Sequence, residues 1–150
     1  MKIWQLTSIV LSALVAGMFY GPWAALSRSM NTFTPEVFLA IVDRMNRNMA
    51  PVMTVLMPGA LLSIFPVLFL SYRTQPATFY LNLAGLILFI AALLVTILIE
   101  VPIVEKIVTW TVSTLPANWQ QLRDRWRTFH ILRVATGLAG LICLLIGAIF

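Results

Sequence analysis

Ionisable and aromatic side chains recur on one side of a helix near the end of the sequence. Trp119, Arg123, Trp126, His130 and Arg133 follow one another at steps of four, three, four and three residues, which places them on one face of an α-helix. An imidazole takes or gives a proton near neutral pH, and an arginine stabilises a developing oxyanion. The stripe therefore predicts acid–base chemistry on an oxygen-bearing substrate, with His130 and Arg133 as catalytic residues.

Two acidic residues flank Pro102, well before this stripe. Glu100 precedes the proline and Glu105 follows it. Charges at membrane depth usually pair with one another, so we expect Glu100 to contact Arg133 or His130 and to act with them. An alternative groups Glu100, Glu105 and His130 as a carboxylate and histidine metal site. We favour the ion pair, assign no metal, and leave the cofactor unassigned.

Aromatic residues beside these groups predict a wall that binds substrate. We expect Trp126 and Trp110 to form that wall and Arg123 to be a second anchor for an oxyanion. A structural alternative is that the arginines extend to lipid headgroups and the tryptophans belong to the aromatic belt of the membrane interface. The sequence alone leaves both interpretations open.

Four methionines recur every four residues, at Met45, Met49, Met53 and Met57. Thioethers are ligands for Cu(I), which makes a copper site one interpretation. A methionine stripe at helical spacing is more often adaptable packing, and Pro51 disturbs its alignment. We therefore favour packing.

Composition shows what kind of protein positions these residues. The 150 residues are 61% hydrophobic and 10% charged, whereas soluble domains are roughly 45–50% apolar and about 25% charged. A soluble enzyme, a disordered tail and a nucleic-acid binder are excluded. A disulfide scaffold is excluded too, because Cys143 is the only cysteine.

Charged residues are absent from four long stretches, residues 3–27, 48–72, 74–99 and 134–150. A helix that spans a bilayer needs about 20 apolar residues. The sequence thus predicts an all-α integral membrane protein, a four-transmembrane-helix bundle with interfacial amphipathic helices. We expect one domain over 1–150, with spans at about 3–26, 50–71, 77–99 and 128–150. The first apolar run exceeds the length of a signal-peptide core, so we expect it to be a retained span.

Basic residues concentrate on one side of these spans. Four spans put both termini and the turn around residue 74 on one side, with only Lys2 and Arg73. The positive-inside rule then places the other side in the cytoplasm, and we expect a bacterial cytoplasmic (inner) membrane with anionic headgroups as partners. The basic residues on that side are Arg28, Arg44, Arg47, Lys106, Arg123, Arg125, Arg127 and Arg133.

The connections between spans also carry helix signals. Thr34-Pro35-Glu36 combines a capping hydroxyl, a first-position proline and an acid, so an amphipathic helix should start there and bend at Pro51 as it becomes span two. Asn118 and Gln121 resemble a capping box. A helix from there to the end would be roughly 48 Å long, which exceeds the roughly 30 Å bilayer core.

Small residues at four-residue spacing predict close helix packing. Ala13, Gly17 and Gly21 form one such seam on span one, and Ala135 with Ala139 forms another on span four. These seams would pack within the bundle or between the subunits of a homo-oligomer.

Three segments resemble the anthrone oxygenase-like family of short four-span membrane proteins. They are Met45 to Pro51, Thr96 to Ile107, and Trp126 to Arg133 with its Trp-x-x-x-His-x-x-Arg pattern. The resemblance implies a four-helix membrane bundle and, for some members, oxygenation of polycyclic aromatic anthrones without a recognised prosthetic group. It adds Asn46 to the substrate-binding residues and departs at Val104, where the pattern has an asparagine.

Two functions of different classes fit the sequence. The leading hypothesis is an oxidoreductase or oxygenase that acts on a hydrophobic aromatic or quinone-like molecule from the bilayer. The alternative is a non-enzymatic membrane subunit, or an assembly or lipid-interacting protein, that uses its glycine seams and arginines. A proton-coupled transporter is disfavoured, because no acidic residue lies at the middle of any span.

Overall fold

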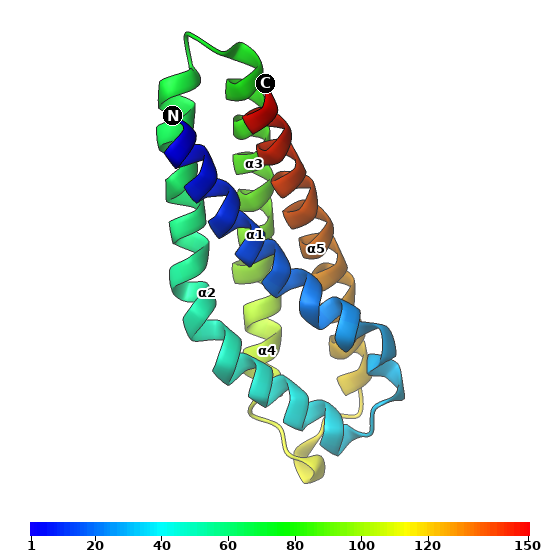
Figure 1. Cartoon of the computed structure of the whole chain (residues 1–150). Coiled ribbons are helices and arrows are strands. Elements are labelled where there is room, and N and C mark those ends of the chain that lie inside the picture. Colours follow the sequence, from blue (N-terminus) through cyan, green and yellow to red (C-terminus); the bar gives the residue numbers. More distant parts are fainter.

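Four long helical rods make up the structure, a computed structural model that describes all 150 residues (Figure 1). The first is α1 (Lys2–Ala25), which a 3₁₀ helix (Ser27–Thr32) joins to α2 (Pro35–Ser71). The third rod is α3 (Pro76–Val95), which continues through a π-helix (Thr96–Glu100) into α4 (Val101–Ile107). After a 3₁₀ turn (Val112–Thr114), α5 (Trp119–Ile149) completes the chain.

Each rod is long and apolar enough to cross a membrane. The candidate spans are Lys2–Thr32, Pro35–Ser71, Pro76–Ile107 and Trp119–Ile149. The predicted all-α, four-helix integral membrane bundle is therefore confirmed. Both termini lie at the same end of the bundle as the turn between α2 and α3, and the longer connections lie at the other end (Figure 1).

The amphipathic segment and the second span form one helix. α2 runs without interruption through Pro51, Pro58 and Pro66, and its ribbon bends where its colour passes from cyan to teal (Figure 1). The bend agrees with the prediction, because a proline removes one backbone donor and clashes with the preceding turn.

The predicted side-chain caps do not form. Thr34 and Asn118 precede α2 and α5, as expected, but neither side chain makes a capping hydrogen bond. Asn118 has φ −102° and ψ 19°, outside the extended region from which a cap side chain reaches the helix. Thr34 has the extended backbone but is exposed, so water can satisfy the free N–H groups of that first turn.

Two apolar clusters hold the rods together. The larger one lies in the middle of the bundle around Ile64, Phe89 and Leu144. A smaller one lies at the end with the longer connections and consists of Met30, Phe38, Val42, Ile103, Ile107 and Trp126. The 3₁₀ helix after α1 and the nearby turns of α2, α4 and α5 are therefore packed against one another, whereas residues 111–114 of the other connection are exposed.

Glycines bring α3 and α5 close together, whereas the predicted seam on α1 does not pack within the bundle. A Cβ at Gly85 would lie 2.8 Å from Leu144 Cδ2 and 3.1 Å from the Gly140 carbonyl oxygen. A Cβ at Gly17 or Gly21 would meet nothing within 4 Å. The α1 seam faces outward, so its interpretation as packing inside the bundle is wrong.

A π-helix widens the third rod just before Pro102. Buried residues on α3 recur at steps of three and four from Thr78 to Ala92, and Thr96 continues that series. Glu100 follows Thr96 by four residues and is buried on the same face, at 2% exposure. Pro102 has no N–H for the Leu98 carbonyl, so the α-helical ladder cannot continue there, and the wider turn absorbs one extra residue.

Candidate active site

A buried ion pair joins the third rod to α5. The Arg133 Nη1 lies 2.5 Å from Glu100 Oε2, and the two side chains are 13% and 3% exposed. Arg133 also donates to the Thr96 hydroxyl at 3.3 Å, and its guanidinium lies 4.5 Å from the centre of the Phe19 ring. Thr96 and Glu100 are the two ends of the π-helix, so this turn supplies both partners of Arg133.

His130 lies behind this pair and fixes the guanidinium. Its side chain is fully buried, and its ring stacks on Trp126 at 4.8 Å and 7°. Arg133 Nη2 lies 2.8 Å from His130 Nδ1. A guanidinium only donates, so Nδ1 accepts this bond and the ring proton is on Nε2, which has no partner. Glu100 Oε1 is farther from Nδ1, at 3.4 Å.

Several polar atoms of this cluster are not satisfied within the chain. Glu100 Oε1 has no hydrogen-bond donor, because His130 Nδ1 at 3.4 Å accepts from Arg133, and Oε2 is held by the ion pair with Arg133. Arg133 Nε is also unpaired. Buried polar atoms without partners are costly and uncommon, and they are expected where a ligand completes the bonding.

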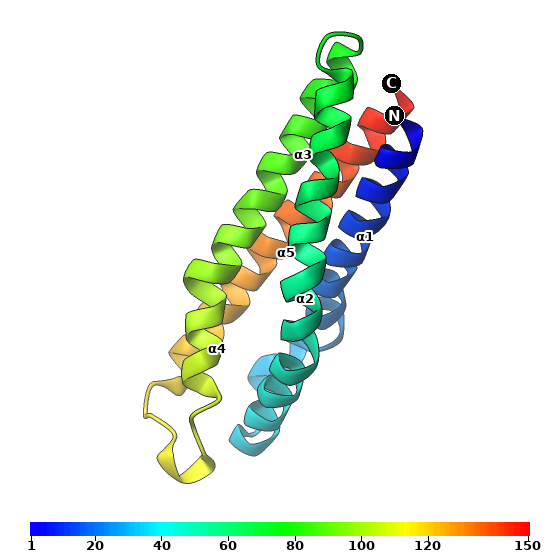
Figure 2. The same cartoon turned by 90° about the vertical axis from the view of Figure 1, so that its left-hand side faces the viewer.

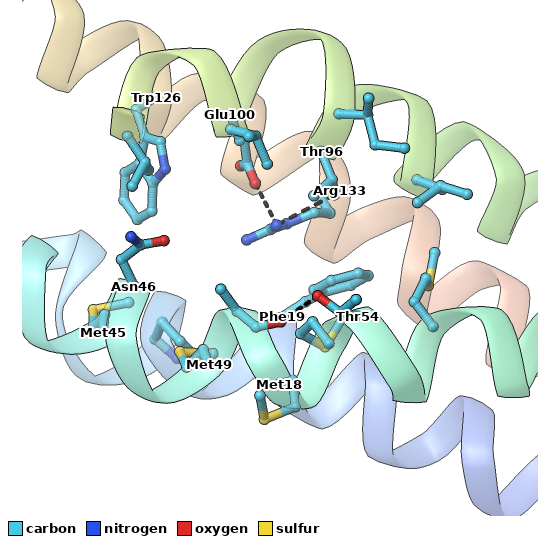
Figure 3. Close-up of a pocket in the computed structure, with 18 of the residues that line it drawn as sticks. Met18, Phe19, Met45, Asn46, Met49, Thr54, Thr96, Glu100, Trp126 and Arg133 are labelled. Carbon is cyan, nitrogen blue, oxygen red and sulfur yellow. Dashed lines mark hydrogen bonds and ion pairs between the residues drawn. The ribbon is translucent and has the colours of Figure 1, made fainter. Parts of the chain in front are cut away.

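The ion pair faces a cavity of about 570 Å³ between α1, α2, the third rod and α5. Fourteen of its 22 lining residues are hydrophobic. Glu100, Arg133 and Thr96 lie on one side, and Asn46 projects from α2 toward Trp126 (Figure 3). Pockets for small molecules commonly have 300–1,000 Å³ and a few polar groups in an apolar lining. The cavity has this composition.

Methionines supply much of the apolar lining. Six of the seven methionines line the cavity, at Met18, Met30, Met45, Met49, Met53 and Met57. The interpretation of the α2 methionines as packing is thus incomplete, because Met45, Met49 and Met53 are only half-buried and border the cavity. Unbranched, polarisable thioethers adapt to flat aromatic surfaces of different outline.

The structure brings most of the predicted site together and leaves two residues elsewhere. Glu100, Arg133, Trp126 and Asn46 line the cavity, and His130 contacts the first two from behind. Arg123 is buried but pairs with Asp124 at 2.9 Å and lies over Trp119 at 5.3 Å. Trp110 packs against the smaller apolar cluster. Neither Arg123 nor Trp110 lines the cavity.

The alternative three-ligand metal set is not formed. No group of three His, Cys, Asp or Glu side chains lies close enough together to hold a metal ion. Glu105 lines the exposed edge of the cavity and makes no ion pair with the buried cluster. Phe19, Thr54 and Thr96 were not predicted as site residues, because an aromatic or hydroxyl residue in an apolar run carries no local signal of a cavity.

Comparison with known families shows which family the chain belongs to. A family model described as anthrone oxygenase matches residues 38–143. The chain belongs to the anthrone oxygenase family. The family match includes Asn46, Glu100, Trp126, His130 and Arg133, whereas Phe19 on α1 lies outside it. No curated protein and no solved structure matches this member of the anthrone oxygenase family.

Proposed function

We propose that the protein is a membrane oxygenase that oxidises a hydrophobic aromatic ketone or phenol of the anthrone type. The observation that carries the proposal is the buried Glu100–Arg133 pair, with unused hydrogen-bonding atoms, at the edge of a methionine-rich cavity. The family supports the same substrate class.

Arg133 is suited to hold the oxygen of such a substrate. Its guanidinium faces the cavity and is held by Thr96, His130 and Phe19, so little reorganisation is needed when negative charge develops on a bound oxygen. Donors fixed in advance in a site with little water stabilise such charge most strongly. Arg133 thus binds the ketone oxygen and stabilises the enolate.

Glu100 is suited to remove a proton. Its carboxylate lines the cavity, and Oε1 accepts no hydrogen bond while Oε2 is held by Arg133. Proton transfer from the benzylic CH₂ of an anthrone to Glu100 leaves the electron pair delocalised onto the oxygen held by Arg133. The carbon then bonds to one atom of O₂, and the resulting peroxide anion takes the proton back from Glu100 to give a hydroperoxide. Loss of the second C–H proton and of hydroxide, as the O–O bond breaks, leaves C=O and one water. The net reaction is CH₂ + O₂ → C=O + H₂O.

His130 is a positioning residue in this scheme, because it lies behind Glu100 and Arg133 and does not line the cavity. Its Nδ1 accepts from Arg133 and fixes the direction of the guanidinium. An asparagine at this position can present an oxygen near the place of Nδ1, whereas an alanine cannot. His130→Asn should therefore keep more of kcat than His130→Ala.

The experiment is turnover of anthrone by the protein in lipid nanodiscs, measured as O₂ uptake and ketone formation above the rate of empty nanodiscs. Glu100→Gln should lower kcat by about 10²-fold or more, the usual contribution of a general base. Arg47→Gln is the matched control, because its ion pair with Asp43 is exposed. Wild-type kcat in a folded Glu100→Gln variant would refute the role of Glu100. Absence of turnover in the wild type would favour the non-enzymatic alternative.

A further inference from the structure

The cavity opens sideways, between α2 and the segment that leads from the π-helix into α4. The exposed residues of its lining divide between these two walls. Asn46, Ala50 and Thr54 lie on α2, and Ile97, Val101 and Glu105 lie on the opposite wall. Figure 2 shows α2 and α4 diverging toward this end of the bundle, so the mouth lies where these rods separate.

The end of the cavity toward the longer connections is closed by packed side chains. Met30, Val42 and Trp126 line the cavity and are also buried in the smaller apolar cluster. Their exposures are 1%, 8% and 8%. This cluster separates the cavity from the polar connections, which leaves the lateral mouth as the open side.

The depth of the mouth follows from helix geometry. Ser71 ends α2 at the opposite face, and the rise from there to Ala50 is roughly 32 Å at 1.5 Å per residue. The hydrocarbon core of a bilayer is about 30 Å thick. Ala50 therefore lies at the boundary between acyl chains and headgroups, with Thr54 deeper and Asn46 beyond the boundary. The apolar part of the mouth faces acyl chains and its polar end faces headgroups.

We propose that the ligand enters the cavity laterally from the lipid, through the mouth between α2 and α4, and not from water. The ligand class is a flat, apolar molecule with one ketone or phenol oxygen, which concentrates at the boundary where the mouth opens. This inference deepens the proposed function, because it names the phase that supplies the substrate. Ala50 on α2 and Val101 on the opposite wall have small side chains. Larger side chains at these two positions should obstruct the mouth.

The test follows the reaction of one cysteine inside the cavity. Met53→Cys is made in a Cys143→Ala background, since Met53 lines the cavity and Cys143 does not. A pyrene maleimide dissolved in the vesicle membrane should label Met53→Cys. A quaternary-ammonium thiosulfonate supplied in water should react slower by an order of magnitude or more, because it carries a charge into an apolar space.

Tryptophan substitutions then test the route. Ala50→Trp and Val101→Trp should each slow labelling from the membrane by an order of magnitude, because a bulky ring fills the mouth. The matched controls are Ala40→Trp on α2 and Val108→Trp just after α4, both exposed and outside the cavity lining. These two control substitutions should change the rate of labelling from the membrane by no more than about twofold. Retention of the α-helical circular dichroism spectrum shows that each variant is folded.

Three results would overturn the route: no labelling by the membrane reagent, equal labelling by the aqueous reagent, or equal effects of mouth and control tryptophans. Labelling needs no turnover, so its outcome is independent of the proposed reaction. Labelling that is sensitive to the mouth, in a protein that does not oxidise anthrone, would keep the route and reject the oxygenase. Turnover of anthrone, with a labelling rate that the mouth tryptophans do not change, would keep the oxygenase and reject the route.

Discussion

Removal of one partner of the Glu100–Arg133 pair should destabilise the protein strongly, and removal of both should cost less than the sum. The two side chains are 3% and 13% exposed. Loss of one partner of a buried pair typically costs about 3 to 5 kcal/mol, because an uncompensated charge is left behind. Replacement of both partners by neutral groups removes that penalty.

The contacts that each partner keeps determine which single variant is less stable. In Glu100→Gln, Arg133 keeps His130, Thr96 and the Phe19 ring, so the cost should be near the lower end, about 3 kcal/mol. In Arg133→Met, Glu100 loses its closest partner and keeps only the His130 ring, 3.4 Å from Oε1, so the cost should approach about 5 kcal/mol. The double variant should recover about 2 to 3 kcal/mol of coupling.

The assay is reversible unfolding in mixed micelles with increasing dodecyl sulfate, followed by circular dichroism and tryptophan fluorescence. The control is Arg47→Gln, which breaks an i,i+4 pair whose side chains are 73% and 43% exposed and should cost about 0.5 kcal/mol or less. Single-variant costs that add within about 0.5 kcal/mol in the double variant would refute the pair as an energetic unit.

Two further predictions concern helix packing and the aromatic wall. Gly85→Ala should destabilise the bundle by about 1 to 3 kcal/mol, because its Cβ would lie 2.8 Å from Leu144, whereas Gly21→Ala should not destabilise it; equal unfolding midpoints in the same micelle assay would contradict the close α3–α5 contact. Trp126→Leu should raise the KM for anthrone severalfold with a smaller change in kcat, because it removes the ring that lines the cavity and stacks on His130; an unchanged KM in the nanodisc assay would remove Trp126 from the binding wall.

The sequence predicts the bundle well because the signals are local and strong. Stretches without charge define the rods, and Pro35 and Pro51 predict the start and the bend of α2. The contact between Glu100 and Arg133 can also be predicted, because an acid at the end of one span and an arginine at the start of the next each require a partner of opposite charge.

The remaining features depend on packing between helices that are distant in sequence. Nothing in the apolar run before Glu100 specifies a π-helix, whose two end residues, Thr96 and Glu100, both contact Arg133. The methionine stripe predicts an apolar surface but not whether a neighbour fills it. Arg123 fits the helical stripe of Arg133, yet it lies more than two turns away along α5 and pairs locally with Asp124.

The π-helix also has a consequence for how this chain can change by mutation. It acts as a one-residue insertion in the third rod, so point substitutions can alter the identity of Glu100 but not its angular position. Deletion of a single codon inside this wide turn would restore α-helical spacing there and leave Ile103 and Ile107 on their present faces, because the turn holds the extra residue. The same deletion elsewhere in α3 meets no wide turn and would turn everything beyond it by about 100°. The carboxylate would then leave Arg133, and Ile103 and Ile107 would leave the cluster that closes the cavity. The third rod should therefore tolerate a change of length within Thr96–Glu100 better than in α3.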